Sequence, residues 1–275
     1  MSVINTNVKS ILAQNALVTN DRSLTKSMQQ LSTGKRINTA ADDAAGLAIS
    51  SRMTSQIRGL DQGVRNANDG ISMLQTAEGA TQEISNMLQR MRELAVQAAN
   101  DTYGTTDRTA IKTEVTELAS EITRISSNTQ WNGMSVLASA STYTFQVGSG
   151  SSSTSSIDVS FSTTMSASNL GVSSASLDLT SNTFAQASIS SIDTAISSVN
   201  TFRSTLGAKI NRLTSAADNL ANISMNTAAS RSRIEDADYA HATTELARAQ
   251  IIQQAGTAML AQANQQPQAV LSLLK

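Results

Sequence analysis

The sequence predicts a mainly α-helical protein: a long antiparallel coiled-coil bundle forming a rod, with a small β-hairpin region and paired terminal helices. Three observations predict this fold class. The chain contains a single proline, so almost nothing in it interrupts a helix. Apolar residues recur at spacings of three and four over long stretches, as they do in coiled coils. One central stretch instead alternates apolar and polar residues, which is typical of strands.

Composition narrows the class of protein. Of the 275 residues, 40 % are hydrophobic but only 3 % are aromatic, which predicts thin, closely packed helix interfaces. The net charge of −1 argues against a nucleic-acid partner, because such binding depends on basic residues that meet phosphates. The lack of cysteine excludes disulfides and thiolate chemistry. The opening residues do not resemble a Sec signal, and no apolar run approaches the roughly 20 residues that cross a membrane.

The first helix is predicted over residues 4–31, with Gly34 as its C-terminal stop. A short connector follows. Thr39 and Asp42 have the spacing of a capping box, and Asp42 and Asp43 favour the positive end of the next helix.

One very long amphipathic helix is predicted over residues 41–100. At 1.5 Å per residue it would be roughly 90 Å long. Five glycines inside it each cost about 1 kcal/mol relative to alanine, so the helix needs packing partners along its length. The apolar seam consists of Ile57, Leu60, Val64, Ala67, Ile71 and Leu74 and, after a phase slip, Ala77, Thr81, Ile84, Leu88, Met91, Ala95 and Ala98.

A third helix is predicted over residues 107–127, folded back antiparallel on the second. Beyond the turn at Trp131, the chain changes character, since residues 125–202 contain no Lys, Arg or Glu. Residues 143–147 and 157–161 alternate apolar and polar positions, which predicts a β-hairpin. The alternative is a disordered serine-rich linker.

Helical periodicity returns over residues 189–220, which predicts a second long helix alongside the first. The last segment, residues 240–274, is rich in Ala and Gln and only weakly hydrophobic, so it would be marginal alone in water. The first helix has the same weakness. Two marginal helices at opposite ends of a chain are expected to pair with each other or with neighbouring copies.

Seven sequence motifs near the two ends of the chain resemble bacterial flagellin. The similarity covers residues 1–137 and 188–275, whereas the centre shows none, which is the pattern of flagellins. The motifs are INTN at 4–7, LSTGKRIN at 31–38, DDAAGLAI at 42–49, RNANDGIS at 65–72, QRMRELAVQ at 89–97, SRIEDADY at 232–239 and QQAGT at 253–257.

The resemblance implies a structural subunit that is exported unfolded by the flagellar type III apparatus and self-assembles into the extracellular flagellar filament for motility. Residues 1–40 and 235–275 would form a terminal coiled-coil domain, the inner tube of the filament. Residues 41–137 and 185–234 would form the helical rod, with 138–184 as its Ser/Thr-rich hairpin and loop insert. The short centre implies that the outer domains of larger flagellins are missing.

The resemblance also implies partners and sites. A surface formed by Gln89, Arg90, Leu94 and Glu114 would contact a neighbouring subunit and the flagellin-sensing Toll-like receptor of animals. A flagellar export chaperone would bind the last segment at Ile251, Leu260 and Leu273. Filament cap and hook-junction proteins are further expected partners, and the Ser/Thr-rich centre could accept O-linked glycans.

Enzymatic chemistry is not expected from this sequence. His241 is the single histidine, so neither a zinc site nor a serine hydrolase triad is predicted, and the glycines do not cluster as a phosphate loop. We expect no catalytic residue, metal or cofactor. Two alternatives to a filament subunit remain from the residues alone: a hook–filament junction protein and another coiled-coil scaffold.

Overall fold

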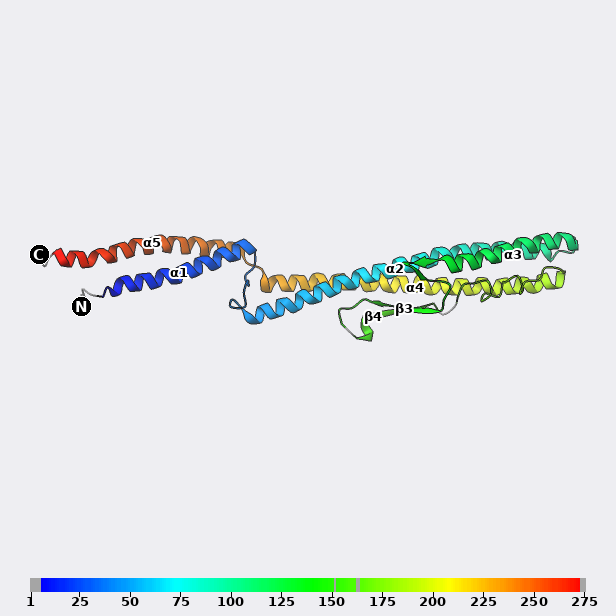
Figure 1. The fold of residues 1–275 in the computed structure, drawn as a ribbon, viewed down its shortest axis with the longest axis horizontal. Helices are drawn as coiled ribbons and strands as arrows, with labels where there is room; N and C mark the ends of the chain where they lie inside the picture. The colour runs from blue at the N-terminus through cyan, green and yellow to red at the C-terminus, as the bar shows by residue number, and fades with distance from the viewer. Residues whose placement is uncertain (1–5, 151, 162–163, 273–275) are drawn as a thin grey trace. The chain divides into compact units, whose positions relative to one another are not determined.

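The computed structural model describes residues 6–150, 152–161 and 164–272, and the chain divides into two compact units (Figure 1). The chain-end unit comprises Met1–Ile57 and Met225–Lys275, and the central unit comprises Arg58–Ser224. The helices are α1 (Val8–Thr33), α2 (Ala44–Ala98), α3 (Thr105–Asn128), α4 (Asn182–Glu235) and α5 (Tyr239–Ser272). The strands are β1 (Gln130–Trp131), β2 (Met134–Ser135), β3 (Ser141–Gln146) and β4 (Ser156–Phe161), with a 3-10 turn, η1 (Ser153–Ser155).

The predicted fold class is confirmed: long helices dominate and the strands form small antiparallel pairs. In the chain-end unit, α1 and α5 lie side by side and antiparallel (Figure 1). Asn7 caps the start of α1, because its side-chain oxygen accepts the Ser10 N–H at 3.2 Å. Gly34 ends α1 as predicted, in the left-handed conformation with φ of 69°.

The start of α2 differs in detail from the predicted Thr39–Asp42 capping box. Asp43 stands directly before the helix, and its Oδ1 accepts the Gly46 N–H at 2.9 Å. Asp42 instead closes the preceding turn, where its Oδ2 accepts the Thr39 N–H at 3.1 Å. The nearer aspartate caps the helix because its carboxylate reaches the unpaired N–H groups of the first turn directly.

Asp42 also binds Lys26, whose Nζ lies 2.9 Å from Asp42 Oδ1. The hydrogen bond from Lys26 and the backbone N–H of Thr39 lower the pKa of Asp42 to about 2. The connector between α1 and α2 is therefore held by a carboxylate that is charged over the whole neutral range.

The central unit is organised around the predicted α2 seam. Val64 and Ile71 are partly buried, and the core of the unit extends from this seam to α3 and α4. The seam positions that are fully buried are Leu60, Ala67, Leu74, Ala77, Thr81, Ile84, Leu88, Met91, Ala95 and Ala98.

The predicted β-hairpin is confirmed in the form of β3 and β4. The two strands pair antiparallel with Ser141 opposite Phe161 and Gln146 opposite Ser156. Phe161 is buried, and its ring packs edge-on against Tyr143 at a centroid distance of 5.6 Å. The hairpin places alternate apolar side chains in the core, which a disordered linker would not do.

Three of the α2 glycines leave room for the hairpin segment. A Cβ at Gly63 would stand 2.5 Å from the Val147 carbonyl oxygen, and a Cβ at Gly70 would stand 3.0 Å from the Phe145 ring. A Cβ at Gly59 would stand 2.8 Å from the Ser149 side chain. Their cost to helix propensity is therefore offset by close packing of the hairpin on the helix, whereas Gly79 has open space around it.

The segment between β4 and α4 contains core residues that the sequence analysis did not identify. Residues 164–181 form no long helix or strand, yet six of their apolar side chains are buried. Their irregular spacing matches neither the helical nor the strand period, so neither pattern identifies them as core residues. They are Met165, Ala167, Leu170, Val172, Leu177 and Leu179.

Candidate assembly and recognition surfaces

A charged cluster joins α2 and α3 on the surface of the central unit. Arg90 donates from Nη2 and Nε to Glu114 Oε1, at 2.9 and 3.1 Å, and from Nη1 to Glu93 Oε2 at 3.2 Å. The hydrogen bonds to Glu114 and then Glu93 raise the pKa of Arg90 above its usual value. All three side chains remain substantially exposed, so the cluster is available to a second molecule.

The structure brings together three of the four residues predicted for this surface. Gln89, Arg90 and Glu114 are exposed. The predicted position of Leu94 on this exposed surface is wrong, because Leu94 is only 3 % exposed and belongs to the hydrophobic core. A step of four residues turns a helix about 40° past a full turn, and here that turn takes Leu94 from the exposed face into the seam with Ala95.

A second ion pair, which the sequence analysis missed, connects α2 with α4. Arg92 Nε lies 2.6 Å from Asp193 Oδ1, and this hydrogen bond raises the pKa of Arg92. No sequence signal could have identified the pair, because its members are far apart in the chain and each is an ordinary surface charge.

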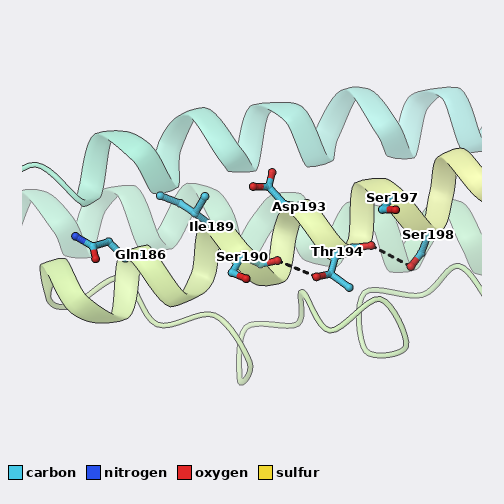
Figure 2. A pocket seen from close by; sticks show the side chains of 7 residues that line it. All are labelled: Gln186, Ile189, Ser190, Asp193, Thr194, Ser197 and Ser198. Carbon is cyan, nitrogen blue, oxygen red and sulfur yellow. Dashed lines mark hydrogen bonds between the residues drawn. The ribbon is translucent and has the colours of Figure 1, made fainter.

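A shallow depression beside Asp193 is lined by polar side chains of α4. Figure 2 shows Ser190, Thr194 and Ser198 along one face of the helix. Thr194 Oγ1 donates to the Ser190 carbonyl and Ser198 Oγ to the Thr194 carbonyl, each at 3.0 Å. Since these hydroxyl protons are used by the helix backbone, we assign no ligand to the depression.

The chain-end unit exposes large apolar side chains on both of its paired helices. Ile251 is 66 % exposed, Leu260 is half-buried, and Leu273 lies outside the described residues. The exposed apolar residues of α1 are Val8, Ile11, Leu12, Val18 and Met28, and those of α5 are Ile251, Ile252 and Met259.

Among residues 6–150, 152–161 and 164–272, no group of three or more His, Asp or Glu side chains is placed to hold a metal ion. None of the helices, as far as they are described, is both long and apolar enough to cross a membrane.

The protein consists of long packed helices, and its terminal pair exposes large apolar side chains. These features are typical of structural proteins that associate through helical surfaces. Comparison with known proteins identifies the family within this class. Residues 4–142 match the model of the bacterial flagellin N-terminal helical region, and residues 189–274 match that of the C-terminal helical region. The chain belongs to the bacterial flagellin family. It is a structural subunit of the flagellar filament, located outside the cell.

Individual relatives agree with this assignment. The chain is 46 % identical over 274 residues to a flagellin of Halalkalibacterium halodurans, covering 99 % of this chain and 100 % of the relative. It is 40 % identical over 288 residues to the flagellar filament 33 kDa core protein of Treponema phagedenis, with 99 % and 100 % covered. These full-length matches do not favour the hook–filament junction alternative.

Two solved structures are similar to the described chain. The crystal structure of Bacillus cereus flagellin is 32 % identical and covers 57 % of this chain and 88 % of its own, with a TM-score of 0.49. A protein of Vibrio parahaemolyticus assigned as flagellar hook-associated covers 71 % of this chain and 100 % of its own, with a TM-score of 0.58. At 14 % identity the second likeness concerns the fold alone.

Proposed function

We propose that the α1–α5 pair is the part of the subunit that forms the inner tube of the filament, through residues 1–40 and 235–275. The rod segments 41–137 and 185–234, with the insert 138–184, then form the surrounding tube. The observation that supports this assignment is the exposure of large apolar side chains on both terminal helices. Monomeric surfaces seldom gather such side chains without a partner to cover them.

The energetics favour assembly through these side chains. Complete burial of one Leu, Ile or Met side chain is worth about 1.5–3 kcal/mol. The five exposed apolar side chains on α1 and the three on α5, each about half exposed or more, therefore add a favourable contribution to association when a neighbouring subunit covers them. Before assembly the same helices are only weakly stabilised, which suits a chain that is exported unfolded by the flagellar type III apparatus.

Single substitutions on α5 test this assignment. Ile251→Asn removes an exposed apolar side chain, and we expect seeded polymerisation to slow at least tenfold while the melting of the monomer is unchanged. Gln254→Asn, also exposed on α5, is the matched control and should polymerise like the parent. Removal of residues 240–275 should abolish filaments altogether. Filaments from the truncated chain in electron micrographs, or parent-rate polymerisation of Ile251→Asn, would contradict the proposal.

Gln89, Arg90 and Glu114 form the second proposed contact, with a neighbouring subunit and with the flagellin-sensing Toll-like receptor. An exposed arginine with two carboxylate partners has the geometry of an interface anchor. Leu94 contributes to this surface only by supporting it from the core.

Arg90→Ala tests the second contact. The pair is exposed, and exposed ion pairs are screened by solvent and contribute little to stability, so we expect the melting of the monomer to change little. Polymerisation and receptor signalling should both weaken, because one surface serves both partners. Arg124→Ala, which removes an exposed arginine paired with Glu121 on α3, is the control and should leave both assays unchanged. A variant at position 90 that polymerises and signals normally would show Arg90 to be an ordinary surface charge.

The remaining proposed partners are a flagellar export chaperone, the filament cap and the hook-junction proteins. The chaperone would bind the last segment through Ile251, Leu260 and Leu273 before export. The exposure of Ile251 supports this role for the described part of the segment. In a calorimetric titration of recombinant export chaperone with the full chain, Ile251→Ser together with Leu260→Ser should weaken binding, and unchanged affinity would refute the site.

A further inference from the structure

The most deeply buried positions of the interface within the α1–α5 pair carry small and polar side chains, with half-buried leucines between them. These positions are Ser10, Asn20 and Ser27 on α1 and Ala242 and Ala249 on α5. Half-buried residues complete a heptad seam on each helix. The seams are Ser10, Ala13, Leu17, Asn20, Leu24, Ser27 and Leu31 on α1, and Ala242, Leu246, Ala249, Gln253, Gly256, Leu260 and Ala263 on α5.

Such an interface needs a specific means of fixing its register. Several of the largest apolar side chains of both helices point away from the seam and are exposed. The seam itself repeats small residues every heptad, and small side chains pack similarly after one helix slides along the other. Packing at these small-residue positions alone therefore distinguishes poorly between the observed register and a slipped one.

Side-chain hydrogen bonds to the backbone of the opposite helix mark the observed register. Among the described residues, they include bonds at three levels of the pair, and the middle one is buried. From the first level to the second, the bonded positions advance thirteen residues along α1 and recede fourteen along α5, as a single antiparallel register requires. The bonds are Asn7 Nδ2 to the Ala263 carbonyl, Asn20 Nδ2 to the Ala249 carbonyl and Tyr239 Oη to the Leu31 carbonyl, each 2.8 Å long.

We propose that Asn20 selects the register of the α1–α5 pair by excluding slips of one helical turn. In the observed register Asn20 is 9 % exposed, and its side-chain amide reaches a backbone carbonyl because Ala249 lets the two helices approach closely. A slip of one turn brings Leu246 or Gln253 opposite Asn20 in place of Ala249. The larger side chain holds the α5 backbone away, and the buried amide loses its acceptor.

Side-chain volume restricts the register at a neighbouring level in the same way. Leu17 occupies the space over Gly256, with its Cδ2 only 2.7 Å from where a Cβ at position 256 would stand. A large residue on one helix thus meets a small one on the other next to the Asn20 level. This selection takes place within one chain, so it does not depend on the assembly proposed above.

Disulfide trapping in the full chain tests the proposal, and the lack of natural cysteine makes it unambiguous. Ser27 and Ala242 lie one heptad from Asn20 and Ala249, so Ser27→Cys with Ala242→Cys reports the observed register. Ser27→Cys with Leu246→Cys reports a slip of one turn. Each pair is oxidised with diamide in dilute monomer, and intramolecular disulfide is measured over time by gel mobility.

With Asn20 present, we expect the first pair to form a disulfide about tenfold to a hundredfold faster than the second. This range corresponds to the free-energy cost of leaving one buried amide without a hydrogen-bond acceptor in the slipped register. Asn20→Leu and the smaller change Asn20→Ala should each lower the ratio of the two rates at least about threefold, while Leu17 over Gly256 retains part of the preference. Asn15→Leu, an exposed position on the same helix, should preserve the parent ratio. Equal rates in the parent, or an unchanged ratio in both Asn20 variants, would overturn the proposal.

Discussion

The two α2 glycines with opposite surroundings provide a sharp test of the packing in the central unit. Gly79 is exposed, and no atom lies within 4 Å of the place that an alanine Cβ would take. Gly63 is buried, and a Cβ added there would stand only 2.5 Å from the Val147 carbonyl oxygen. That carbonyl has little freedom to move. The Val147 N–H donates to the Ser155 carbonyl at 2.8 Å, and Asn66 Nδ2 holds the adjacent Gln146 carbonyl at 2.8 Å.

The magnitudes follow from these surroundings. Both Gly→Ala changes gain about 0.5–1 kcal/mol from helix propensity. At Gly63 the methyl group must displace backbone, an overpacking cost of about 1–3 kcal/mol. Gly79→Ala should therefore stabilise the central unit, Gly63→Ala should not, and the difference of about 1–3 kcal/mol corresponds to roughly 2–12 °C in Tm.

Thermal unfolding followed by circular dichroism measures this difference. Gly70→Ala should fall between the two, because its Cβ would meet the Phe145 ring at 3.0 Å and a ring yields more easily than a carbonyl. Hydrogen exchange should report faster opening of β3 in Gly63→Ala. If Gly63→Ala raised Tm as much as Gly79→Ala, the hairpin would not be seated on the α2 backbone.

Three further predictions concern the core, the connector and the chain ends. Leu88→Ala, at a fully buried seam position, should cost about 2–5 kcal/mol in chemical denaturation, whereas Val96→Ala, at a 49 % exposed position, should cost little. The folded-state pKa of Asp42, about 2, lies below its unfolded value of about 3.9, so its contribution is present above pH 4 and is lost as the pH falls through 2. An NMR titration of the Asp42 carboxyl in the folded chain should show this midpoint, and a midpoint near 4 would mean that Lys26 does not bind it. Limited proteolysis of the monomer should trim residues 1–40 and 235–275 before the central unit, and equal resistance of both parts would contradict the weak stability of the terminal helices.

The helices and the hairpin could be predicted because their information is local. A seam at spacings of three and four fixes which side of α2 is buried, and it does so from Leu60 to Ala98 without any knowledge of the partner helices. The left-handed turn at Gly34 follows from the residue type. Alternation in β3 and β4 identified the core-facing side chains of the hairpin for the same reason.

The candidate surfaces were only partly predictable. The family resemblance indicated Gln89, Arg90, Leu94 and Glu114, but the burial of Leu94 depends on a helix rotation of some tens of degrees that spacing does not resolve. The Arg92–Asp193 pair joins residues with no local relation. In the chain-end unit, the weak terminal helices predicted pairing, but their register depends on which backbone carbonyl the buried Asn20 amide reaches.

The sequence by itself thus determined the class, the family resemblance and the helical and strand periods, since each of these is a property of neighbouring residues. Tertiary structure alone decided which glycines lie beneath another segment, and it alone placed Met165 and Leu179 in the core. The physical reason is that burial is a relation between distant parts of the chain. A glycine or a lone leucine belongs to no periodic pattern from which its tertiary neighbours could be predicted. Its burial depends on atoms that only the packed structure brings near.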